Sequence, residues 1–155
     1  MTNKKETKHV QLVTGTFLYY SCAINPTMIV ALNDIAVVQS KPTQKTLQKC
    51  DRLINYAATY PNAKLRFFAG DMILHVDSDA ANLVQDNACS GIAGYYILSS
   101  YPNSAPTIPQ LAPNAPILVK CKTLCSVVAS AAEAETGGLF HNGQTIIHIH
   151  QLAQG

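Results

Sequence analysis

The spacing of the apolar residues changes near Pro61, and this change constrains the fold more than any other feature of the chain. Before Pro61, apolar residues recur every three or four positions, which is typical of helices that bury one face. After Pro61, short apolar runs such as residues 94–100 have the length and composition of strands. A helical pattern returns near Ser126. Helices, then strands, then one helix predict an α+β or α/β fold.

Three helices are predicted before Pro61, over residues 10–24, 25–40 and 44–60. Thr43 is a suitable N-cap for the third helix, and Pro61 ends it. One apolar stripe on each helix is expected to contribute to a shared core. The predicted core positions are Val10, Val13, Phe17, Leu18, Cys22, Met28, Ala31, Ile35, Val38, Leu47, Cys50, Leu53, Ile54 and Ala57.

The chain is expected to have a short tail and two structured parts. Residues 1–8 are polar and basic, and we expect them to form a disordered tail. A helical segment then covers residues 9–62, and a domain of strands and one helix covers residues 63–155. The boundary follows from the change of apolar spacing rather than from a linker of distinct composition.

Four strands are predicted after the boundary, over residues 64–70, 72–79, 94–100 and 117–121. The first two are expected to form a hairpin that turns at Gly70 and Asp71. Five prolines within residues 102–116 predict a loop. A final helix is expected from Ser126 to about Phe140, where glycines weaken it.

Composition limits the functional classes only weakly. Charged residues make up 13% of the chain, which is about half the usual share. A net charge of +2 argues neither for nor against nucleic-acid binding. The apolar runs are shorter than the roughly 20 residues that span a bilayer, so no membrane contact is expected. Five cysteines without CxxC spacing predict neither a zinc site nor a disulfide framework, which favours an intracellular protein, cytoplasmic or nuclear.

Three carboxylates are candidates for a metal site. Asp77 and Asp79 end a predicted strand and share one of its faces, because side chains alternate along a strand. In the last helix, Glu135 falls on the face that carries Ala131, Ala132 and Leu139, whereas Glu133 falls on the solvent side.

A buried carboxylate is costly unless it is paired or binds a metal ion, and carboxylates are ligands that Mg²⁺ prefers. The alternative reading is that residues 77–79 form a strand-ending turn. Glu135 would then pair with Lys120 or Lys122.

Four segments in order resemble one known family. They are QLVTG…AKL (11–65), SDA (78–80), AGYYILSS (93–100) and APILVKCKTLCSVVASAAEAE (115–135). Together they resemble the end of a copia-type retrotransposon polyprotein. In that family, the last helical segment of the reverse transcriptase is called the connection, and a ribonuclease H domain follows it.

The resemblance implies a partial ribonuclease H-like mixed sheet with one packed helix in residues 63–155. Asp79 matches the first catalytic aspartate of the family and Glu135 its catalytic glutamate, with Asp77 as the reserve. These residues would bind Mg²⁺ or Mn²⁺, and a two-metal mechanism would hydrolyse the RNA strand of an RNA–DNA hybrid.

One departure from the family is large, because no carboxylate follows Glu135 in this sequence. We therefore expect a C-terminally truncated domain with an incomplete carboxylate set, inactive or very weak as a phosphodiester hydrolase. A non-catalytic alternative is a fragment that binds nucleic acid or protein, or that self-associates through an exposed sheet edge. A third hypothesis is a metal site formed by His148 and His150 with His141.

Overall fold

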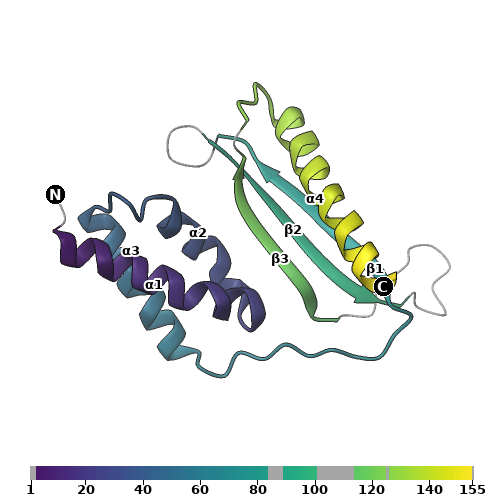
Figure 1. Cartoon of the computed structure of the whole chain (residues 1–155), viewed down its shortest axis with the longest axis horizontal. Helices are drawn as coiled ribbons and strands as arrows, with labels where there is room; N and C mark the ends of the chain where they lie inside the picture. The colour runs from purple at the N-terminus through teal and green to yellow at the C-terminus, as the bar shows by residue number, and fades with distance from the viewer. Residues whose placement is uncertain (1–2, 84–88, 101–113, 125, 155) are drawn as a thin grey trace. The chain divides into compact units, whose positions relative to one another are not determined.

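A computed structural model describes residues 3–83, 89–100, 114–124 and 126–154 of the chain (Figure 1). Its elements are α1 (Lys4–Ala23), the short 3-10 helix η1 (Pro26–Met28), α2 (Ile29–Val37), α3 (Gln44–Thr59), β1 (Ile73–Ala81), β2 (Ser90–Ser99), β3 (Pro116–Leu124) and α4 (Ala131–Gln154). The order of helices before strands confirms the predicted α+β fold.

The chain forms two compact units, Met1–Leu65 and Arg66–Gly155, so the division lies close to the boundary expected at residue 62. In the first unit, α1 begins at Lys4, inside the segment that we expected to be a disordered tail. The reason is a capping box. Asn3 Oδ1 accepts from Glu6 N at 2.9 Å, and Glu6 Oε2 accepts from Asn3 N at 2.7 Å. These two bonds satisfy amide groups that a helix start otherwise leaves unpaired.

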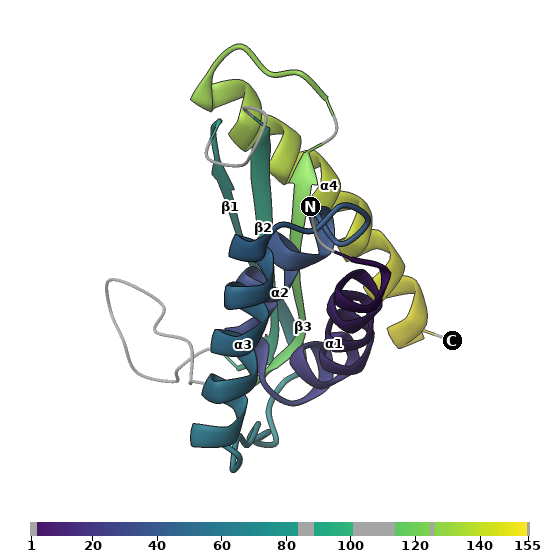
Figure 2. The ribbon, with the colours of Figure 1, turned by 90° about the vertical axis from the view of Figure 1, so that its left-hand side faces the viewer.

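The three helices of the first unit gather around one apolar core (Figure 2). Its buried members are Val10, Val13, Met28, Leu32, Ile35, Cys50 and Leu53, with Phe17, Tyr20, Leu47, Ile54 and Ala57 packed against them. The stripe predicted on α3 is confirmed in full. Leu18, Cys22 and Ala31 are exposed instead, because α1 and α2 turn neighbouring positions toward the core.

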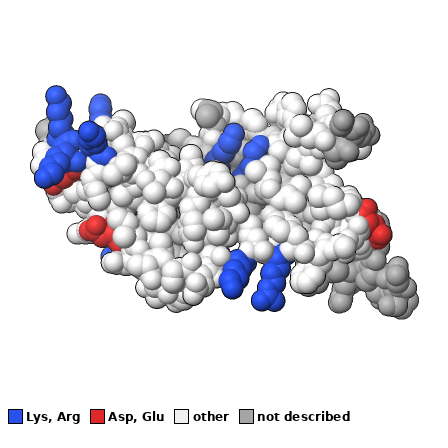
Figure 3. Space-filling model, turned by 60° about the horizontal axis from the view of Figure 1, so that its bottom comes forward, with Lys and Arg blue, Asp and Glu red and all other residues white. Residues whose placement is uncertain are grey.

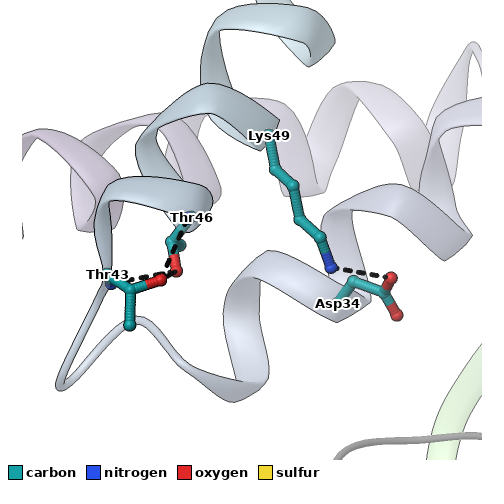
Figure 4. Close-up of polar contacts among 4 residues, drawn as sticks. All are labelled: Asp34, Thr43, Thr46 and Lys49. Carbon is teal, nitrogen blue, oxygen red and sulfur yellow. Dashed lines mark hydrogen bonds and ion pairs between the residues drawn. The ribbon is translucent and has the colours of Figure 1, made fainter.

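Polar contacts fix the entry to α3 and its contact with α2 (Figure 4). Thr43 is the N-cap as predicted, and its hydroxyl accepts from Thr46 N at 3.3 Å. Thr46 Oγ1 accepts in return from Thr43 N at 3.1 Å. Lys49 Nζ of α3 lies 3.4 Å from Asp34 Oδ2 of α2.

The three described strands form one antiparallel sheet in the order β1-β2-β3. The expected hairpin is therefore wrong, because residues 64–70 form no strand and β1 pairs with β2. Backbone groups of Arg66 and Phe68 instead form hydrogen bonds with the residues just before β3. Ala115 N donates to Arg66 O at 3.0 Å, and Phe68 N donates to Asn114 Oδ1 at 3.1 Å.

The prolines expected to form a loop fall mainly in residues 101–113, which lie outside the described part, and Pro116 begins β3. No described strand runs parallel to another, so the mixed character expected of the sheet is not found within the described residues.

Helix α4 crosses one face of the sheet and continues well past Phe140, where we expected it to end (Figure 1). Its buried positions are Ala134, Gly138, Asn142 and Thr145. A Cβ added at Gly138 would lie 3.5 Å from Ala80 Cβ, which is an ordinary van der Waals contact, so α4 packs directly on β1 at this position. The face predicted from Ala131, Ala132 and Leu139 is exposed, because α4 turns the face with Ala134 and Gly138 toward the sheet instead.

Among the described residues, no helix has the length and apolar character that a membrane span requires.

Candidate functional site

The two predicted aspartates lie on the sheet face that points away from α4. Ser78 faces α4, because Asn142 Nδ2 donates to its hydroxyl at 2.8 Å. Side chains alternate along β1, so Asp77 and Asp79 point to the opposite face. Both aspartates are exposed.

Glu135 is half-buried on α4, next to the buried Ala134. It forms no hydrogen bond or ion pair with another described residue, so the alternative of pairing with Lys120 or Lys122 is not found. The ion pair within the described residues is Lys49–Asp34. Glu133 is exposed, as predicted, and its carboxylate accepts from Ala129 N at 2.7 Å at the start of the helix.

The structure does not gather the predicted metal ligands into a site. Asp77 and Asp79 belong to one face of the sheet, whereas the helix that carries Glu135 packs on the other. Within the described part of the chain, no three His, Cys, Asp or Glu side chains lie close enough together to hold a metal ion. This includes the three histidines His141, His148 and His150.

A hydrogen-bonded network around Asn142 occupies the place between α4 and the sheet. Asn142 is 3% exposed, and its Nδ2 donates to Ser78 Oγ and to Ala93 O, each at 2.8 Å. Its Oδ1 accepts from Tyr96 OH at 2.8 Å. A Cβ at Gly94 would collide with the Asn142 side chain, so glycine is needed there. The side-chain amide of Asn142 donates two hydrogen bonds and accepts one, and these bonds offset the free-energy cost of burying it.

Beside this network, a pocket of about 200 Å³ opens between β3 and α4. Its lining residues are Ile92, Lys120, Lys122, His141, Asn142, Gln144, Thr145 and His148. No described Asp or Glu lines it. Because charged side chains are sparse over the protein, as the face in Figure 3 illustrates, a pocket with two lysines and two histidines is a local concentration of basic groups. We call it the basic pocket.

Lys120 is held at the wall of the basic pocket. Its Nζ donates a hydrogen bond to Thr145 Oγ1 of α4. Burial lowers the pKa of the Lys120 ammonium, and the charge of Lys122 lowers it further. Two cations are therefore held close enough to repel each other, and a bound anion would relieve that repulsion.

His141 and His148 also face the basic pocket, while His150 is not among its lining residues. Their spacing of seven residues puts them on one side of α4, and Lys120 and Lys122 share one face of β3. The spacing in the sequence is therefore enough to place each pair of basic residues on one face of its own element. It does not show that α4 packs against β3 and brings the two pairs together, so the pocket was not predicted.

No family model matches the chain, and comparison with curated proteins and with solved structures finds no significant match.

Proposed function

We propose that the C-terminal unit is a retroelement-derived, ribonuclease H-like domain that binds a nucleic-acid backbone without hydrolysing it. The observation that carries the proposal is the basic pocket, with Lys120, Lys122, His141 and His148 around a space of about 200 Å³. Phosphate contacts by lysines supply most of the affinity of proteins that bind nucleic acids without reading their sequence. The RNA–DNA hybrid is the partner that the sequence resemblance suggests.

The separation of the carboxylates supports the non-catalytic part of the proposal. Two-metal hydrolysis needs carboxylates that converge on ions about 4 Å apart. Asp77 and Asp79 point away from the face on which α4 packs, and Glu135 belongs to α4. This arrangement would bind Mg²⁺ or Mn²⁺ too weakly to support turnover, so hydrolysis is assigned to the ancestral domain and not to this one.

The test is fluorescence anisotropy with a labelled RNA–DNA hybrid over a series of salt concentrations. We expect the double variant Lys120→Gln with Lys122→Gln to bind more weakly. The slope of log affinity against log salt should fall in magnitude by about two, since each phosphate contact contributes about 0.9 on B-form DNA. The control is Lys41→Gln with Lys45→Gln, which removes the same charge from exposed positions in the other unit.

Equal losses in both double variants would contradict the basic pocket as the binding site. Hybrid cleavage in Mg²⁺ or Mn²⁺ that disappears in Asp79→Asn or Glu135→Gln would contradict the absence of hydrolysis. These two parts of the proposal can therefore fail separately.

Self-association through a sheet edge is the competing proposal. Among the described strands, β1 and β3 each have one unpaired edge. If two copies paired symmetrically through β1, Asp77 and Asp79 of one copy would meet those of the other, and pairing through β3 would oppose Lys120 and Lys122. Like charges at an edge disfavour such pairing. Light scattering should give a monomer, and a stable dimer would favour self-association instead.

A further inference from the structure

We infer that the groove between α2 and α3 is a binding site for an apolar molecule that carries one carboxylate. The groove has a volume of about 390 Å³ and lies wholly within the first unit. Its lining residues are Thr27, Met28, Ala31, Asp34, Ile35, Lys49, Arg52, Leu53 and Tyr56. Pockets of this size with an apolar floor and a few polar groups are typical ligand sites.

The floor of the groove is apolar and already part of the core. Met28, Ile35 and Leu53 line the groove and are buried to 4% exposure or less, so they form a closed apolar floor rather than an opening into the core. Ala31 is exposed and leaves the entrance open, because its side chain is too short to cover the floor. At roughly 30 Å³ for each non-hydrogen atom, the space accommodates about a dozen atoms.

Polar contacts between helices border the groove. Thr27 Oγ1 lies 3.0 Å from Tyr56 OH, and Lys49 Nζ lies 3.4 Å from Asp34 Oδ2 (Figure 4). Arg52 lies between Lys49 and Tyr56 along α3, one helical turn from each, so it is at the middle of this border.

The charges around the groove favour an anion. Asp34 is already paired with Lys49, whereas Arg52 forms no ion pair with a described residue. The lining therefore carries two positive charges and one negative charge. A guanidinium binds a carboxylate through two parallel hydrogen bonds, which suits Arg52 at the entrance above an apolar floor. An alkyl chain on the floor with its carboxylate on Arg52 satisfies both features.

The first experiment titrates the full-length chain with octanoate, octanamide and octylammonium while amide chemical shifts are followed by NMR. We expect octanoate to shift the amides of residues 27–56 and to bind roughly tenfold more tightly than octanamide. Octylammonium should bind most weakly. A peptide ending in leucine, with a free or an amidated C-terminus, then distinguishes a protein C-terminus from a small carboxylate as the source of the anion.

Three variants locate the site. Arg52→Gln should remove the preference for octanoate over octanamide. Ala31→Phe should fill the groove from an exposed position and weaken both ligands. Lys45→Gln, which removes a cation of α3 outside the groove, should change neither.

Binding of octanoate, of the free-acid peptide or of both supports the inference if Arg52→Gln weakens it. Absence of shifts in residues 27–56 with both anions would overturn it. The same holds for octanoate binding that Arg52→Gln and Ala31→Phe leave unchanged. None of these outcomes depends on whether the other unit binds nucleic acid.

Discussion

The helices of the two units are held in place by different kinds of contact. The first unit packs three helices around seven buried apolar or thiol side chains, among them Val10, Leu32 and Ile35. The second unit places an amide, Asn142, between its helix and its sheet, and makes room for it with Gly94. A core of apolar side chains tolerates replacement by other apolar side chains of similar volume. A buried polar network, by contrast, is destabilised when any one of its hydrogen-bond partners is lost.

The polar network of the second unit specifies one packing arrangement more strictly than the apolar core of the first unit does. Apolar contacts have no preferred direction, so the burial of Leu32 and the exposure of Leu18 depend on how the whole surface of each helix packs. Asn142, by contrast, meets Ser78, Ala93 and Tyr96 in a single register of helix on sheet. The network therefore selects one placement of α4, and that placement also creates the basic pocket.

The largest effect is expected from Ile35→Ala, which removes a fully buried side chain from the first unit. Loss of transfer free energy and the residual cavity should lower the free energy of unfolding by about 3 to 4 kcal/mol. Val37→Ala, at a side chain that is 55% exposed on the same helix, is the control and should cost well under about 1 kcal/mol. Hydrogen exchange measures both. Equal loss of protection in both units would show that they unfold together.

A somewhat smaller loss is expected from Asn142→Ala, which breaks the polar network. Tyr96 OH, Ala93 O and Ser78 Oγ lose a partner inside the interface, and we expect a cost of about 3 kcal/mol. Gln144→Ala, at an exposed position of α4, should be nearly neutral. Urea unfolding with amide exchange as readout checks this. An unchanged second unit in Asn142→Ala would mean that apolar contacts alone hold α4.

Two glycine substitutions should shift stability in opposite directions. Gly94→Ala places a Cβ against Asn142 and 2.9 Å from Tyr96 Cε2, and the overpacking should cost about 2 kcal/mol. A Cβ at Gly143 in α4 meets nothing within 4 Å, so Gly143→Ala should gain about 1 kcal/mol of helix propensity. Thermal melts compare the two. A stabilising Gly94→Ala would show that the close approach at Asn142 does not occur.

The smallest effect concerns alkaline pH and has opposite signs in the two units. Burial, with a contribution from Asp51, raises the pKa of the Cys50 thiol above its ordinary 9.0. The folded state then keeps a proton that the unfolded chain loses, so the free energy of unfolding falls as pH rises past 9.0. The pKa of Lys120 is lowered below its ordinary 10.5 by burial and by Lys122. Its folded state releases a proton first, so the free energy of unfolding rises toward pH 10.5.

Urea unfolding of the wild type, Cys50→Ala and Lys120→Gln at about pH 8 and about pH 10 separates the two contributions. Cys50→Ala should lose the downward slope and Lys120→Gln the upward one. Identical slopes in all three proteins would contradict both assignments.

Local sequence determined the elements whose signals act over a few residues. Thr43 and Pro61 bracket α3, and its stripe through Cys50 and Leu53 is the buried one, because caps and helical periodicity depend on near neighbours. The start of β1 near residue 72 and the exposure of Glu133 follow in the same way.

Tertiary structure alone decided the pairing of β1 with β2, the face on which α4 packs and the side of the sheet taken by Asp79. Periodicity placed Asp77 and Asp79 together, but it could not say which face of β1 would meet the helix. The hydrogen bonds of Asn142 determine which face of β1 meets α4, because they join it to Ser78 and Tyr96, which lie 64 and 46 positions away in the chain. A buried amide must find all of its partners, and only the folded chain brings them within reach.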